Sequence, residues 1–163
     1  MTLIFKNQIL LYVYVFLLGL ISSFSLPPYD IFYLNFISYP AFLWILLIYP
    51  NDKVKSFNIG WTFGFGYFIS SLYWITNSLT FEDNFKPLIP FALILIPLFL
   101  GLFYGLSTLT FSFLNPKKNF LSILILATTI SAFEYIRSFL FGGFPWNLIA
   151  FSFVNYLEFI QIL

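Results

Sequence analysis

Glu134 and Arg137 are the two residues of this sequence whose types and spacing most clearly suggest chemistry. They stand three positions apart near the end of an apolar stretch, and residues at that spacing share one face of a helix. An ionisable group inside a bilayer costs about 2.5–3.5 kcal/mol on insertion scales, so such groups usually have a role. We interpret the pair either as an ion pair or snorkelling arginine that fixes packing, or as a site that faces a polar cavity.

A short loop of glycine and aromatic residues follows this pair, with the sequence Gly142-Gly143-Phe144-Pro145-Trp146. Two adjacent glycines end a helix and allow positive φ angles. Tryptophan favours the interface between lipid and water. The loop is therefore either a helix stop with an aromatic anchor or a shaped site for a lipid headgroup, and the neighbouring charged pair favours the second interpretation.

Helix packing is predicted where glycines recur four positions apart, because small residues at this spacing let membrane helices approach closely. Two such pairs occur, and their members are Gly60, Gly64, Gly101 and Gly105. Tyr73 and Trp74 stand near the end of another apolar stretch. Aromatic residues at that position form an interfacial belt or contact lipid directly.

The residue types that the sequence lacks exclude several classes of chemistry. There is no cysteine and no histidine, which removes the thiol nucleophile, cysteine-ligated metals and the commonest general base. Glu82 and Asp83 are the only acids close together, and they lie in a loop. We therefore expect no metal, no cofactor and no catalytic residue in this chain. The net charge of +1 includes no basic block, so we expect no nucleic-acid partner.

The composition places these residues in a membrane protein. The chain has 163 residues, of which 61% are hydrophobic and 8% are charged, whereas a soluble domain has roughly 45–50% apolar and about 25% charged residues. A membrane-spanning barrel would need alternating polar and apolar residues. Runs such as Leu93 to Ile96 are instead apolar throughout. The sequence therefore predicts an all-α integral membrane protein.

Apolar stretches of about 20 residues, the length that crosses a bilayer, predict the elements that position the candidate site. The predicted spans are about 8–26, 31–49, 57–79, 88–114 and 121–141, with the start of another at about 153–163. The residues Pro27, Pro28, Tyr29 and Asp30 predict a structural turn after the first span, because paired prolines cannot continue a helix. The predicted fold is a bundle of five transmembrane helices plus the start of a sixth, forming one domain, 1–163.

The positions of the basic residues predict how the bundle is oriented. Five lysines fall on one side of the predicted spans, namely Lys6, Lys53, Lys55, Lys117 and Lys118. Lysine and arginine are enriched in cytoplasmic segments of membrane proteins. The N-terminus is therefore predicted to be cytoplasmic, and the loop at 142–146 to face outward.

Three motifs, taken in chain order, match the pattern of one known family. They are Leu26-Pro27-Pro28-Tyr29-Asp30; Gly60-Trp61 with Phe63-Gly64-Phe65-Gly66-Tyr67-Phe68 and Leu72-Tyr73-Trp74-Ile75; and Glu134-Tyr135-Ile136-Arg137 followed by Gly143-Phe144-Pro145-Trp146 and Phe151-Ser152. With them the chain resembles the N-terminal membrane part of apolipoprotein N-acyltransferase. The resemblance covers essentially all of the sequence. After the Pro-Trp, this chain has Ala150-Phe151-Ser152-Phe153 where the family commonly has Gly-Tyr-Ser-Gln.

The resemblance implies a function and partners. Members of that family move an acyl chain from a phospholipid to the diacylglyceryl-modified N-terminal cysteine of lipoproteins, at the outer face of the bacterial inner membrane. The implied partners are a phospholipid acyl donor, a diacylglyceryl-modified lipoprotein acceptor and membrane lipid. The family's catalytic cysteine, glutamate and lysine lie in a nitrilase-like domain outside the membrane, and none of them can be assigned here. Roles in substrate binding or site shaping are implied for Glu134, Arg137, Gly143, Phe144, Pro145, Trp146, Tyr73 and Trp74.

The last apolar segment suggests a truncated chain. From Val154 to Leu163 there are ten residues, too few to cross a bilayer, so we expect a fragment that is inactive by itself. Two other functions stay open. The chain could be a non-enzymatic scaffold or a subunit of a split enzyme, which would co-purify with a partner. It could also be a small transporter, for which Pro90 and Pro97 are the only hint.

Overall fold

A computed structural model describes residues 7–49, 52–114, 120–140, 147–156 and 158, and within these ranges the regular structure is entirely helical. The five α-helices are α1 (Gln8–Ser23), α2 (Asn35–Ile48), α3 (Lys53–Ser71), α4 (Ile89–Phe113) and α5 (Phe120–Phe139). Four 3₁₀ segments join or flank them, namely η1 (Phe32–Leu34), η2 (Tyr73–Thr80), η3 (Asp83–Leu88) and η5 (Ile149–Phe153). The all-helical class predicted from the sequence is confirmed.

Polar caps fix where two of the helices begin. The side chain of Asn7 accepts a hydrogen bond from the backbone N–H of Ile9 at 2.9 Å, and α1 starts between them. The carboxylate of Asp52 accepts from the backbone N–H of Lys55 at the same distance. Side-chain acceptors at this position satisfy N–H groups that a helix start leaves unpaired. The Asp52 cap explains why α3 begins at Lys53, four residues before the predicted boundary at 57.

The far end of α3 also differs from the sequence prediction. The α-helix ends at Ser71, and the predicted stretch up to 79 continues as the 3₁₀ segment η2. In η2 the hydroxyls of Thr76, Ser78 and Thr80 each donate to the carbonyl oxygen three residues earlier, at 2.6–2.7 Å. Hydroxyl side chains that bond nearby carbonyls compete with regular α-helical geometry. A cluster of three such residues accounts for the early end of the α-helix.

Two helices are long and apolar enough to cross a membrane, by length and composition. They are the continuous stretch Asp83–Phe113, which contains α4, and Phe120–Phe139, which is α5. The stretches Gln8–Ser23 and Phe32–Ile48 are also apolar but shorter. Most of the predicted sixth segment, at about 153–163, lies outside the described residues.

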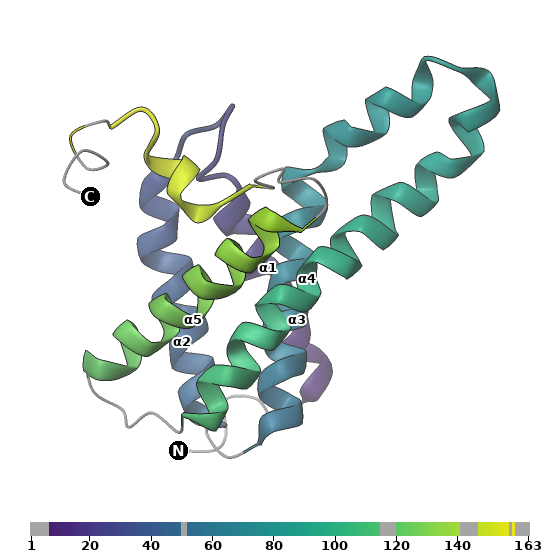
Figure 1. Cartoon of the computed structure of the whole chain (residues 1–163). Coiled ribbons are helices and arrows are strands. Elements are labelled where there is room, and N and C mark those ends of the chain that lie inside the picture. The colour runs from purple at the N-terminus through teal and green to yellow at the C-terminus, as the bar shows by residue number, and fades with distance from the viewer. Residues whose placement is uncertain (1–6, 50–51, 115–119, 141–146, 157, 159–163) are drawn as a thin grey trace.

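Successive helices alternate in direction, so the C-terminal ends of α1, α3 and α5 lie at the same end of the bundle (Figure 1). In Figure 1, α3 and α4 run antiparallel and extend through η2 and η3 into a long hairpin that projects beyond the other helices. The helix α1 packs against α3, and α5 crosses α4. At the opposite end, the Lys53 ammonium lies 3.8 Å from the centre of the Phe113 ring. The start of α3 and the end of α4 therefore meet there.

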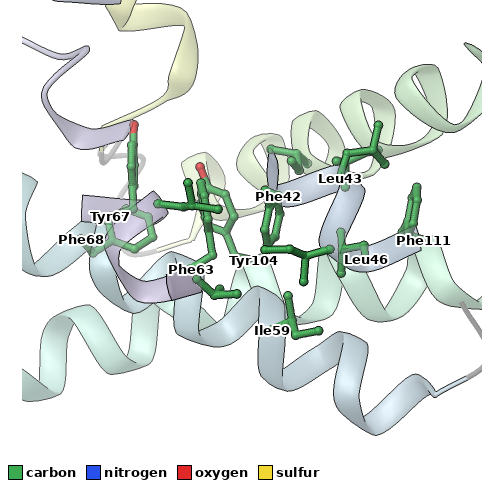
Figure 2. Packing of buried hydrophobic residues seen from close by; sticks show 14 of the residues in the cluster. Phe42, Leu43, Leu46, Ile59, Phe63, Tyr67, Phe68, Tyr104 and Phe111 are labelled. Carbon is green, nitrogen blue, oxygen red and sulfur yellow. The ribbon is translucent and has the colours of Figure 1, made fainter. Parts of the chain in front are cut away.

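An aromatic core holds α2, α3 and α4 together. The Phe42 and Phe63 rings stack with their centroids 4.2 Å apart, and the Phe63 and Tyr104 ring centroids are 5.5 Å apart. All three side chains are buried, and Figure 2 shows them beside Ile59 and Leu46. Stacked aromatic pairs contribute roughly 0.5–1.5 kcal/mol beyond the area they bury. Close packing of these rings joins the three helices.

Glycines allow α3 to lie close against α4. A Cβ at Gly64 would lie 2.8 Å from the Cα of Gly101, nearer than real Cβ atoms approach. At Gly60 it would overlap the Thr108 hydroxyl, and Gly105 faces the Phe57 ring. Small residues therefore line this contact, as they do where membrane helices pack tightly.

The turn predicted after the first span joins α1 to η1. Pro27 and Pro28 are linked by a cis peptide bond, and Asp30 has a positive φ of 56°. The backbone N–H groups of Tyr29 and Asp30 both donate to the carbonyl oxygen of Leu26. These bonds turn the chain back toward the start of α2.

Candidate functional site

Arg137 and Glu134 form an ion pair one turn before the end of α5. An Nη of Arg137 lies 3.8 Å from an Oε of Glu134, and the two side chains are 1% and 13% exposed. The guanidinium carbon lies 4.8 Å from the centre of the Phe68 ring on α3. An arginine that snorkelled to lipid headgroups would be exposed, so this interpretation of Arg137 is wrong. The side chain instead packs between α5 and α3.

The buried guanidinium leaves two nitrogens without an acceptor among the described residues, namely Nη1 and Nη2 of Arg137. Beside them lies a small void of about 10 Å³ lined by residues of α4 and α5, including Tyr104 and Ser107. A space of that size holds one water molecule. Buried arginine donors usually have hydrogen-bond partners. The two unpaired nitrogens of Arg137 are therefore an unusual feature of this end of α5.

Glu134 also holds the segment that follows the predicted loop. Its Oε1 accepts a hydrogen bond from the backbone N–H of Ile149 at 3.2 Å, at the start of η5. The Asn147 side chain donates to the carbonyl oxygen of Ser71 at 3.0 Å, and the Tyr67 hydroxyl donates to the carbonyl oxygen of Asn147 at 3.1 Å. The segment 147–153 is thus tied to α5 and to the end of α3. We call this end of the bundle the η5 end.

A second polar chain ties the same segment to α1 and α2. The Ser22 hydroxyl donates to Oδ1 of Asn35 at 2.9 Å, and Nδ2 of Asn35 donates to the Ser152 hydroxyl at the same distance. All three side chains are buried. Neither Asn35 nor Ser22 was predicted to be a site residue. The signal was available, because Asn35 is the only amide side chain in the predicted span 31–49, and buried amides in membrane helices commonly bond across helices.

Replacing Asn35 with alanine should release the η5 segment from the bundle. The change leaves two buried serine hydroxyls without their amide partner, and an unsatisfied buried polar group costs about 1–3 kcal/mol. Hydrogen–deuterium exchange should then be faster at residues 149–153, with little change in the core of α3. The matched control is Asn77→Ala, at an exposed asparagine of η2. Equal exchange in both variants would contradict an anchoring role for Asn35.

The other predicted site residues lie apart from this cluster or outside the described residues. Tyr73 and Trp74 are half-exposed on η2, and Tyr73 borders a small hollow with Ile96 and Pro97 of α4. The structure does not bring either of them to the ion pair. The loop residues Gly143, Phe144, Pro145 and Trp146 fall in the range 141–146, which lies outside the described residues.

A groove of about 500 Å³ runs between α2 and α5 and ends at Glu134. Its walls include Tyr39, Leu43 and Leu47 from α2, and Ala127, Ser131 and Glu134 from α5, while Ile149 and Ala150 of η5 border it at the η5 end. The Tyr39 hydroxyl is 3.0 Å from that of Tyr104, with which it shares a hydrogen bond. The sequence did not predict this groove.

Comparison with known proteins gives consistent matches. The family model for the apolipoprotein N-acyltransferase N-terminal domain matches residues 18–163. A protein of Sinorhizobium fredii named apolipoprotein N-acyltransferase is 38% identical over 146 residues, which covers 84% of this chain and 27% of that protein. Proteins of the same name from Brucella suis and Rhizobium meliloti are each 36% identical over 146 residues, with the same coverage. The chain therefore spans about a quarter of the length of these relatives.

Proposed function

Because this chain belongs to the apolipoprotein N-acyltransferase family, we propose that it is the membrane part of an enzyme that acylates bacterial lipoproteins. The enzyme would take an acyl chain from a phospholipid and transfer it to the N-terminal diacylglyceryl-cysteine of a lipoprotein. The observation that carries this proposal is the family match over residues 18–163. The 163 residues include no cysteine, so we expect no acyl transfer through a thioester from this chain by itself.

The proposed arrangement in the membrane is five spans with a cytoplasmic N-terminus, in the bacterial inner membrane. Two long apolar helices and two shorter ones support it. The helix α3 packs between α1 and α4, so it follows their course through the bilayer. Lys53 and Lys55, at the start of α3, would then face the cytoplasm. The η5 end would face outward, toward the lipoprotein substrate.

The geometry supports a role for the η5 end in shaping the site. Glu134 and Arg137 precede the loop at 142–146, and Asn147 and Ile149 follow it. The described residues on both sides of the loop are held by polar contacts that are buried or partly buried. We propose that these contacts fix the ends of the loop at the membrane surface, where both acylated substrates would enter.

A chimera tests the proposed function. Residues of this chain replace the matching stretch of the Sinorhizobium fredii relative, and the hybrid is expressed in cells depleted of their own N-acyltransferase. Lipoproteins from these cells should gain the mass of one acyl chain, as measured by mass spectrometry. The control is the relative without its matching stretch, which should not add the chain. A hybrid that reaches the membrane in normal amounts but never acylates a lipoprotein would contradict the proposal.

One observation favours a second candidate, in which the chain is a non-enzymatic scaffold or a subunit of a split enzyme. The 163 residues contain no cysteine, and a chain in either of these roles needs none of its own. The transporter interpretation is less supported, because transporters commonly use broken helices at their binding sites, whereas α4 is continuous through Pro97. In the chimera experiment a scaffold or a transporter predicts no acylation, whereas a subunit of a split enzyme predicts acylation, as the proposed function does.

A further inference from the structure

We propose that the small void between α4 and α5 binds one water molecule, which joins the Arg137–Glu134 ion pair to α4. The walls of this void come from α4 and α5, so it is a different space from the groove between α2 and α5. Three features support the site: the unpaired nitrogens of Arg137, the distance between the two charged groups, and the size and lining of the void.

The guanidinium of Arg137 needs an acceptor that the described residues do not provide. Its Nη1 and Nη2 are buried and have no hydrogen-bond partner among these residues, and the side chain as a whole is 1% exposed. An unsatisfied buried donor costs free energy. Buried waters commonly bond to groups of this kind, so a water beside the guanidinium removes part of that cost.

The distance within the ion pair is one that a water can bridge. Nη2 of Arg137 lies 3.8 Å from Oε1 of Glu134, beyond the range of roughly 2.7–3.2 Å for a direct N–H···O hydrogen bond. The same Oε1 accepts from the Ile149 N–H, which holds the carboxylate toward η5. Polar groups that face each other across more than ~3.5 Å often share a water. A water can accept from Arg137 and donate to Glu134.

The void has the volume and the lining that one water requires. The space open to the centre of a water molecule is about 10 Å³, close to the minimum of roughly 10–15 Å³ for a single water. Polar residues line it from both helices, with Tyr104 and Ser107 on α4 and Glu134 and Arg137 on α5. The Ser107 hydroxyl donates to the Thr129 hydroxyl across 3.4 Å. Its oxygen keeps lone pairs that can accept from a water.

The chemistry of the lining selects water over an anion. A guanidinium by itself binds anions well, but the Glu134 carboxylate borders the same space and repels negative charge. A chloride ion is also larger than the water for which the void is just sufficient. Water is neutral and both donates and accepts, so it can bond to the guanidinium, the carboxylate and the Ser107 hydroxyl together. The end of α5 is then joined to α4 through the water.

Radiolytic footprinting tests the site in the whole chain, reconstituted in lipid nanodiscs. A short X-ray pulse converts bound water into hydroxyl radicals that oxidise the side chains beside it, and mass spectrometry measures the oxidation of each residue. Tyr104 lines the void and is 3% exposed, whereas Phe111 on the same helix is 2% exposed and lies outside the lining. After correction for the reactivity of each ring, oxidation should be several-fold greater at Tyr104. Equal oxidation of the two residues would contradict a bound water.

Two substitutions at one position test whether the water lies in the void. Ser107→Val fills the space with methyl groups, whereas Ser107→Ala removes the hydroxyl and leaves the space open. Oxidation of Tyr104 should fall to the level of Phe111 in the valine variant. It should stay well above that level in the alanine variant, because Arg137 and Glu134 still hold the water. Circular dichroism and size-exclusion chromatography verify that each variant is folded.

Every other result with folded protein overturns the proposal. Unchanged oxidation of Tyr104 in Ser107→Val would place the water elsewhere, such as in the groove beside Tyr39. Loss of oxidation in Ser107→Ala would show that the ion pair does not hold the water. If the valine variant does not fold, the alanine variant and the comparison of Tyr104 with Phe111 still decide. The measurement involves no acyl transfer, so its outcome is independent of the proposed function.

Discussion

Replacing Gly66 with alanine is expected to remove most of the folded protein from the membrane fraction. A Cβ at this position would overlap the carbonyl oxygen of Phe16 and lie 3.2 Å from the backbone nitrogen of Leu20. Both atoms belong to the backbone of α1, so no side-chain rotation relieves the overlap. The helices α1 and α3 must separate, and overpacking of this kind costs about 1–3 kcal/mol or more. In lipid, lost contact is not offset by apolar burial elsewhere.

The control for Gly66→Ala is the same substitution at Gly105. There the new Cβ would lie 2.8 Å from the edge of the Phe57 ring, and a partly buried ring can rotate away. Detergent-solubilised protein is followed by size-exclusion chromatography after heating. Gly105→Ala should retain a single folded peak with a small fall in Tm, whereas Gly66→Ala should yield little folded protein. Similar Tm values for the two variants would show that α1 and α3 are not held at backbone contact.

These two positions also show what a sequence can and cannot predict about packing. Gly101 and Gly105 form a recognisable pattern of small residues, and the structure places both on the side of α4 that faces α3. Gly66 and its neighbour across the contact, Gly19, have no second glycine four positions away. Gly19 faces the backbone of α3 and Gly66 faces the backbone of α1. Which glycines meet depends on the register between two helices far apart in the chain, and local spacing does not encode that register.

The helix boundaries also include some that the sequence predicts and some that it does not. The predicted boundaries of the fourth span, 88 and 114, each lie within one residue of the ends of α4. The boundaries of α3 differ more, because a capping carboxylate at Asp52 and three hydroxyls in η2 decide them. Single hydrogen bonds of this kind contribute only about 1 kcal/mol each. They still decide where a helix ends when the apolar pattern is continuous.

For the candidate site, the sequence indicated the charged pair but not what surrounds it. A spacing of three residues predicts that Glu134 and Arg137 share a face of the helix. In the structure an Nη of Arg137 lies 3.8 Å from an Oε of Glu134. The bond from Asn35 to Ser152 joins residues 117 positions apart. The groove requires two helix walls and η5 together. Both features exist only after the bundle forms, so no local motif could predict them.

Arg137→Met is expected to destabilise the protein by about 3–5 kcal/mol, because it leaves the Glu134 carboxylate in a nearly buried site without its cation. Methionine keeps a linear apolar side chain against the Phe68 ring and fills most of the vacated space. The loss should therefore come from the unpaired charge rather than from a cavity. Unfolding in a titration with sodium dodecyl sulfate measures the change in the free energy of unfolding.

The double variant Arg137→Met with Glu134→Gln should recover most of that loss. Glutamine retains an oxygen that can accept from the Ile149 N–H, and neither side chain then carries a charge. Buried ion pairs replaced by apolar or neutral groups are often close to neutral in stability, so we expect the double variant within about 1 kcal/mol of the parent. A double variant as unstable as Arg137→Met would mean that the arginine stabilises the bundle through Phe68 and not through Glu134.

Acyl transfer by the chimera then tests whether the Glu134–Arg137 ion pair only stabilises the fold or also takes part in the reaction. If the ion pair only fixes packing, the double variant should recover transfer together with stability. We expect stability to recover while transfer stays low, because the carboxylate that borders the groove is missing. Glu134→Gln alone, at matched membrane abundance, is the companion measurement. Normal transfer by the stable double variant would assign Glu134 and Arg137 to packing alone.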